Sequence, residues 1–198
     1  MSQLECRGNE ELSDMSYLRT FAPWIVYAII PSAHWQWAAL IALIMSVVEV
    51  ARQLRAGRTL DALMIEIGSL VFFAALTALA FADPNTALHP YSPALSSGVL
   101  ALIALVSLAL RKPFTLGIAK QTTPQELWDN PVFIRTSYVL TSVWAASFVI
   151  GCIVLTALAH ADSTPRTIAQ VLAFVIPVVF TIRYVAYIQS KARTAAEA

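Results

Sequence analysis

Long apolar stretches separated by short polar connections dominate this sequence of 198 residues. A bilayer hydrocarbon core of ~30 Å needs about 20 helical residues, so an apolar stretch of that length predicts a membrane-spanning helix. Such stretches cover residues 35–51, 62–82, 93–110, 132–159 and 166–189. A further stretch, 15–31, has a shorter apolar core and contains Pro23. The pattern predicts an all-α fold, a polytopic transmembrane helix bundle of six spans with a short first span.

Proline follows a hydroxyl or amide residue at the start of three of these stretches. The pairs are Ser92-Pro93, Asn130-Pro131 and Thr164-Pro165. Because such pairs are typical of a helix N-cap and first turn, we expect each to begin a helix. Residues 123–126 have the spacing of a capping box, which predicts a short helix between two spans.

Composition excludes several classes of protein. Hydrophobic residues make up 58% of the chain and charged residues only 13%, which is too apolar for a soluble domain of this size. The net charge of +1 leaves no basic surface for nucleic acid. Cys6 lies in the polar N-terminal segment and Cys152 in an apolar stretch, so we expect no disulfide between them.

The positive charges predict the orientation. Lysine and arginine are retained on the cytoplasmic side of a membrane. Six spans with both termini in the cytoplasm place 12 of the 13 positive residues inside, and only Arg166 falls elsewhere. Residues 15–190 then form a single transmembrane domain between polar tails 1–14 and 191–198. In the alternative, five spans cross, 15–31 is re-entrant, and the acidic N-terminus lies outside.

A set of aromatic, proline and glycine residues carries a family resemblance. It comprises the short apolar segment 21–27, Arg111-Lys112-Pro113-Phe114 with Gly117, Trp128, Trp144 and Phe148. Over roughly residues 20–160 the chain resembles the bacterial intracellular septation protein A family. The resemblance implies an integral inner-membrane protein of the cell envelope, involved in septation, with no established catalysis. This chain departs from the family by extending beyond the fifth span and by a less aromatic N-terminal half.

Four ionisable residues lie within spans near the predicted cytoplasmic boundary: Glu49, Glu66, Arg135 and Arg183. Charges inside a membrane are costly, ~2.5 to 3.5 kcal/mol at mid-bilayer, so convergence on one polar site is a candidate arrangement for substrate binding. In the alternative, the arginines snorkel to the surface and Glu49 pairs locally. Span 132–159 adds Tyr138, Thr141 and Trp144 as candidate lining residues, or as helix-packing residues.

The connection 111–131 mixes bases with apolar residues. Its candidate lipid-docking or partner-docking residues are Arg111, Lys112, Phe114, Lys120 and Trp128. With its apolar side chains submerged, this connection could lie on the inner leaflet, where anionic lipid is the natural neighbour. The alternative is a basic loop that only obeys the orientation rule.

Other features predict less. Pro177 is expected to bend the last span. His34, His89 and His160 lie at predicted external ends of spans without helical ligand spacing, so we predict no metal site and no cofactor. Nucleotide, zinc-protease, thiol-redox and hydrolase motifs do not occur in the sequence.

These observations favour a non-enzymatic inner-membrane protein that acts in septation and envelope maintenance. Its expected partners are membrane lipids, anionic ones among them, and other inner-membrane proteins, with homo-oligomerisation left open. The alternative is a small-solute or ion transporter with a cytoplasmic-side charged site. A membrane-embedded enzyme comes third, because no nucleophile or cofactor site is visible.

Overall fold

The computed structural model describes residues 19–30, 32–58, 63–121 and 123–197. In this part of the chain every regular element is a helix. An N-terminal helix covers residues 19–29. The further α-helices are α2 (Trp35–Arg55), α3 (Met64–Ala82), α4 (Ser92–Ala109), α5 (Phe114–Ala119), α6 (Pro131–Ala157) and α7 (Ser163–Glu197). Short 3-10 helices are η1 (Ser32–His34), η3 (His89–Tyr91) and η4 (Gln125–Leu127).

Five of these helical segments are long and apolar enough to cross a membrane, namely Trp35–Arg55, Met64–Ala82, His89–Ala109, Pro131–Ala157 and Ser163–Lys191. The chain is therefore an all-helical, multi-pass membrane protein, as the hydropathy pattern predicted. The predicted N-terminal tail 1–14 lies outside the described residues. The predicted C-terminal tail 191–198 continues α7 as a helix to Glu197.

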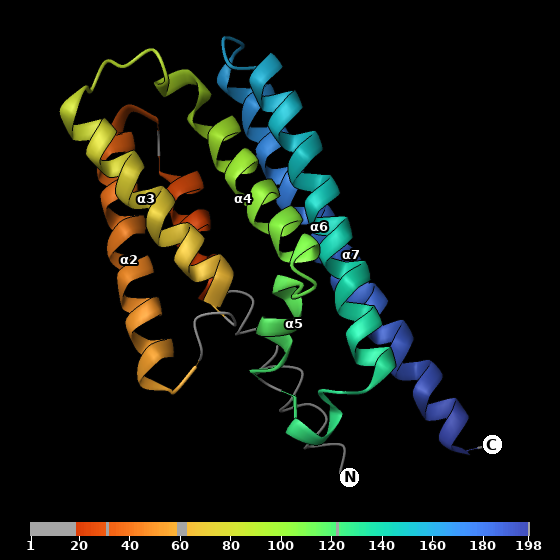
Figure 1. Cartoon of the computed structure of the whole chain (residues 1–198). Helices are drawn as coiled ribbons and strands as arrows, with labels where there is room; N and C mark the ends of the chain where they lie inside the picture. The colour runs from red at the N-terminus through yellow and green to blue at the C-terminus, as the bar shows by residue number, and fades with distance from the viewer. Residues whose placement is uncertain (1–18, 31, 59–62, 122, 198) are drawn as a thin grey trace.

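The spanning helices form two groups (Figure 1). In one group α2 packs against α3, and in the other α4 packs against α6, which also packs against α7. The helix 19–29 lies between the groups. At 1.5 Å per residue it is ~17 Å long, about half of a bilayer core. Its first turn bonds to Glu66 at the start of α3, whereas Trp35, shortly after it, stacks on His89 before α4. The segment thus runs from one end of the bundle towards the other.

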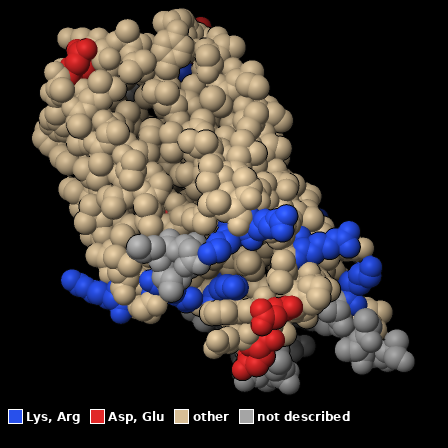
Figure 2. Space-filling view, viewed as in Figure 1, with Lys and Arg blue, Asp and Glu red and all other residues tan. Residues whose placement is uncertain are grey.

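The charges separate along the bundle axis (Figure 2). Lys and Arg side chains gather at one end, where α2 and α4 finish and α3 and α6 begin. We call this the basic end. The described bases that lie on connections or helix termini there include Arg55, Arg58, Arg111, Lys112, Lys120 and Lys191. The segregation fits the orientation rule that places such residues in the cytoplasm.

All three proline pairs lie at a helix start, as expected, but a side-chain cap forms at one of them. Asn130 is the N-cap of α6, and its Oδ1 accepts the backbone N–H of Val132 at 2.8 Å. Ser92 and Thr164 do not cap, because α4 begins at Ser92 itself and α7 begins at Ser163. The short helix predicted between two spans is present as η4, but the predicted capping box is wrong, since η4 follows Pro124 without a side-chain cap.

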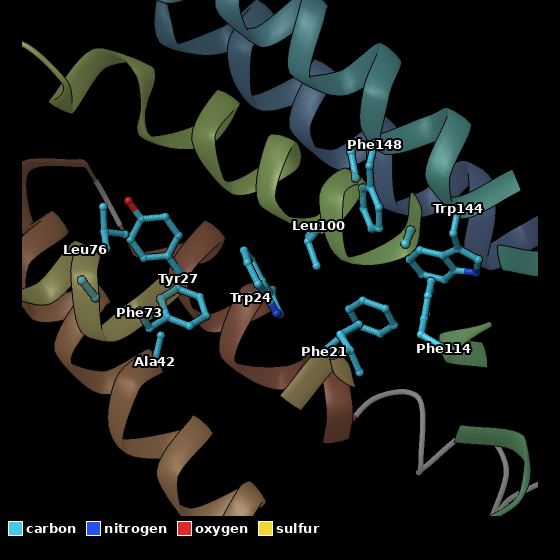
Figure 3. Close-up of a cluster of buried hydrophobic side chains, with 14 of the residues drawn as sticks. Phe21, Trp24, Tyr27, Ala42, Phe73, Leu76, Leu100, Phe114, Trp144 and Phe148 are labelled. Carbon is cyan, nitrogen blue, oxygen red and sulfur yellow. The ribbon is translucent and has the colours of Figure 1, made fainter. Parts of the chain in front are cut away.

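Aromatic side chains of the N-terminal helix fill the space between the two helix groups (Figure 3). Phe21 stacks on Trp144 of α6, with ring centroids 4.7 Å apart and planes at 5°. On the other side, Trp24 contacts Phe73 of α3 at 4.8 Å and donates a hydrogen bond to Ser69 Oγ at 2.7 Å. The N-terminal helix therefore joins the two groups through close packing of large rings.

Pro177 lies inside α7, and neighbouring side chains compensate for its missing N–H. The proline leaves the carbonyl of Ala173 without its helical donor. Ser147 Oγ of α6 donates to this carbonyl at 2.9 Å. One turn further along, Trp144 Nε1 donates to Thr181 Oγ1 at 3.1 Å, and Thr181 donates to the Pro177 carbonyl at 2.7 Å. The predicted interruption is thus held by hydrogen bonds with α6.

Candidate functional site

Two helices finish at the basic end in the same backbone motif. After α2, Gly57 has φ +74°, its N–H bonds to the Leu54 carbonyl, and the N–H of Arg58 bonds back to the Gln53 carbonyl at 3.1 Å. The end of α4 repeats this pattern with Arg111 at φ 57° and the N–H of Lys112 on the Ser107 carbonyl at 2.9 Å. These are Schellman turns, and each brings a basic residue directly after its left-handed position.

A pocket of about 370 Å³ opens beside these turns. Its walls come from the α2–α3 connection, the start of α3, and the segment around α5, and they comprise Gly57, Arg58, Met64, Ile65, Lys112, Pro113, Phe114, Leu116, Gly117, Lys120 and Trp128. Three of these residues are basic and, among the described lining residues, none is acidic. The pocket therefore combines a cationic rim with an apolar wall.

Trp128 and Lys120 form one side of the pocket as a unit. Lys120 Nζ lies 4.8 Å from the centroid of the Trp128 ring, within cation–π range. The indole N–H of Trp128 donates to the Thr123 carbonyl at 3.0 Å, which holds the ring in place. The arrangement presents a positive charge next to an aromatic face, and aromatic residues of this kind are enriched at membrane interfaces.

The structure brings four of the five predicted docking residues together, since Lys112, Phe114, Lys120 and Trp128 all line this pocket. Arg111 does not line it, because its left-handed turn leaves the side chain exposed. The expectation that Phe114 is submerged in lipid is wrong: its side chain is buried at 5% exposure against protein. Its ring contacts Phe21 and Trp144 in the core.

The four charged residues predicted to converge do not form one site. Glu49 and Glu66 are buried on the α2–α3 side of the bundle, whereas Arg135 and Arg183 are exposed. Within the described residues, neither arginine makes a salt bridge with an acid. Arg135 lies on α6 and Arg183 on α7, two helices of the group that does not contain α2 and α3 (Figure 1). The snorkelling alternative describes the two arginines better.

The two acids occupy a polar cluster inside the α2–α3 side. Glu49 Oε1 accepts hydrogen bonds from Gln53 Nε2 at 2.9 Å and from Arg52 at 3.4 Å, the local pairing that its spacing allowed. Gln53 also reaches Gln121 at 3.4 Å. Glu66, at 3% exposure, accepts a bond from Thr20 of the N-terminal helix at 3.2 Å. The residues of this cluster come from four segments at the basic end: the N-terminal helix, α2, α3 and the connection after α5.

The polar face of α6 serves helix packing. Thr141 is fully buried and shares a hydrogen bond of 2.7 Å with Thr115 of α5. Trp144 is 1% exposed and bonds to Thr181 of α7. Tyr138 is partly buried on the same helix. The contacts of Thr141 and Trp144 fit interhelical hydrogen bonding rather than the lining of a water-filled passage.

At the opposite end, histidines pair with aromatic residues. His89 stacks on Trp35 at 4.8 Å, and His160 shares a hydrogen bond of 3.1 Å with the Tyr91 hydroxyl. A second, apolar pocket of about 370 Å³ lies nearby and is lined in part by Gly98 and Cys152. Across the described residues, no group of three or more potential metal ligands comes together.

Sequence reasoning missed several residues of these sites. Arg58 was counted for orientation only, although its place directly after Gly57 at a helix end is a signal for a Schellman turn. No sequence pattern pointed to Thr20 or Gln121 as site residues. Thr20 lies 46 positions from its partner Glu66, and Gln121 lies 68 positions from its partner Gln53. Distant partners of this kind are decided by packing.

Comparison with known proteins adds no further identification: the chain matches no family model, no curated protein and no solved structure.

Proposed function

We propose that this chain is a non-enzymatic protein of the bacterial inner membrane that docks anionic lipid or the acidic surface of another membrane protein at its basic pocket. In this proposal it acts in septation and envelope maintenance, the role implied by its resemblance to the septation protein A family. The single observation that carries the docking role is the pocket itself, in which Arg58, Lys112 and Lys120 surround an apolar wall. Each base near an anionic surface contributes ~1 kcal/mol, so three can hold a lipid headgroup.

The proposal includes six passes with both termini in the cytoplasm. The contacts of Thr20 with Glu66 and of Trp35 with His89 support a sixth pass that includes the helix 19–29. This topology predicts that Cys6 is protected from an impermeant thiol reagent in intact cells. Labelling of Cys6 from outside would contradict it and favour the five-span alternative.

Lipid retention tests the docking role. The purified protein in detergent is expected to carry anionic phospholipid, measured by native mass spectrometry. Lys120→Gln should lower the retained fraction about fivefold, because one surface base is worth ~1 kcal/mol. Arg135→Gln is the matched control, since Arg135 is exposed on α6 and does not line the pocket. Equal loss in both variants would show that only the overall charge matters.

A cellular assay tests the role in septation. In the native host, depletion of the protein should delay septum formation and lengthen cells. Lys120→Gln expressed at the normal level should restore division less well than Arg135→Gln. Normal division after depletion would contradict the septation role but leave lipid docking untouched.

Transport of an ion or small solute is the second candidate. The observation that favours it is the buried pair of acids, Glu49 and Glu66, inside membrane helices. Intramembrane acids commonly mark ion pathways. The filled aromatic core between the helix groups argues against a wide solute passage, so an ion is the better cargo. Flux into proteoliposomes that is lost in Glu66→Gln would support this candidate.

A further inference from the structure

Glu66 carries a buried oxygen with no partner in the described part of the chain. Its Oε1 accepts the hydroxyl of Thr20 at 3.2 Å, but Oε2 has no hydrogen-bond partner there, and the residue is only 3% exposed. Buried carboxylate oxygens are normally satisfied, because removing such a group from water without a partner is costly. The open oxygen therefore indicates that a group other than the donors of the described residues completes this site.

The groups that face Glu66 increase the need for positive charge. The helix α2, which packs against α3, carries Glu49, the second buried acid on this side of the bundle. From the N-terminal helix comes Thr20, which is neutral, while its neighbour Arg19 is exposed. Glu49 already takes the guanidinium of Arg52, whose side chain is 53% exposed. Within the described residues, the one salt bridge made by these two acids is therefore that of Glu49 with the partly solvated Arg52, and Glu66 makes none.

We propose that Glu66, with its unpartnered Oε2, forms a binding site for one monovalent cation, a proton or a sodium ion, reached from the basic end. Both ligands supply the same chemistry, a single positive charge on Oε2. The surrounding Lys and Arg side chains repel a hydrated metal ion, whereas a proton passes along water and hydroxyl groups; the proton is the expected ligand. The inference gives the transport candidate a specific cargo, and it is independent of lipid docking.

Infrared spectroscopy of the full-length protein in nanodiscs tests the proton. At neutral pH, where solvent-exposed glutamates are ionised, wild type should show the carbonyl band of a protonated, buried carboxyl. Glu66→Gln should lose this band, and Glu126→Gln, the matched control at an exposed glutamate on η4, should keep it. Thr20→Val tests in a second way whether the band belongs to Glu66. Loss of the Thr20 hydroxyl, which donates to Glu66, should shift the band without abolishing it.

A second experiment, on the effect of sodium on thermal stability, distinguishes the two ligands. The midpoint of thermal unfolding is compared in NaCl and in choline chloride of the same ionic strength, because a ligand that binds only the folded state raises stability. A sodium-specific rise in wild type that is absent from Glu66→Gln would assign the cation as sodium. An ionised Glu66 at neutral pH with no sodium-specific rise would overturn the proposal. Because binding is measured without flux, a failure of transport would leave the site intact.

Discussion

The hydrogen bond between Ser147 and the Ala173 carbonyl gives a sharp test of how α6 supports the bend in α7. Pro177 removes the helical donor of this carbonyl, and Ser147 Oγ replaces it at 2.9 Å. Side-chain hydrogen bonds between membrane helices contribute ~0.6 kcal/mol on average and up to ~1.7 kcal/mol. Because Ser147→Ala also leaves a carbonyl unsatisfied, we expect a loss in the upper part of that range, about 1 to 1.7 kcal/mol.

The same substitution should cost less when the proline is absent. In a Pro177→Ala background, residue 177 has an N–H that can bond to the Ala173 carbonyl, so Ser147 is no longer its sole donor. We expect Ser147→Ala to cost less than about 0.5 kcal/mol there. The difference between the two backgrounds is the coupling energy of a double-mutant cycle.

Unfolding in mixed micelles, followed by steric trapping, measures all four variants. Ser142→Ala is the control on the same helix, because the exposed Ser142 hydroxyl bonds only to the Tyr138 carbonyl one turn earlier. Its loss should be near zero. The reasoning fails if Ser147→Ala costs the same with and without Pro177, or no more than Ser142→Ala.

Three further predictions use the same unfolding assay. Phe21→Ala should lower stability by about 3 kcal/mol through loss of the stack on Trp144, whereas Ile29→Ala, 73% exposed, should change it little; equal effects would contradict the joining role of the N-terminal helix. Gly151→Leu should cost at least ~1 to 3 kcal/mol, since even a Cβ there would lie 2.9 Å from that of Ala173; a neutral result would exclude the close approach of α6 and α7. Arg111→Gly should stabilise by ~1 kcal/mol, because its φ of 57° favours glycine; a loss would contradict the Schellman turn.

The existence of the spanning helices followed from hydropathy, but their capped ends did so only in part. The Asn130 cap forms because the residue precedes Pro131 in extended backbone and its Oδ1 reaches the next free N–H. Ser92 has the same local sequence pattern, yet η3 continues directly into α4 and removes the position where a cap would act. Local sequence states which residues can cap, whereas the preceding backbone decides which one does.

In the candidate sites, too, the sequence predicted some features and the tertiary structure decided others. Lys112, Phe114, Lys120 and Trp128 were predicted together because one connection carries them all. The proposed convergence of Glu49 and Glu66 with the two arginines failed, because similar depth on four helices does not specify the rotation of each helix about its axis. Glu66 bonds to Thr20 of the N-terminal helix and Glu49 bonds within α2, whereas both arginine side chains are exposed.

By itself, the sequence determined that this protein is a membrane helix bundle and that its positive charges gather at one end. Both follow from the free energy of placing each residue in lipid or water, which depends on local composition. Only the tertiary structure decided that the N-terminal helix lies between two helix groups, that Ser147 compensates for Pro177, and that Glu66 keeps an open oxygen. Those features depend on the packing of segments distant in sequence, which periodicity and composition do not encode.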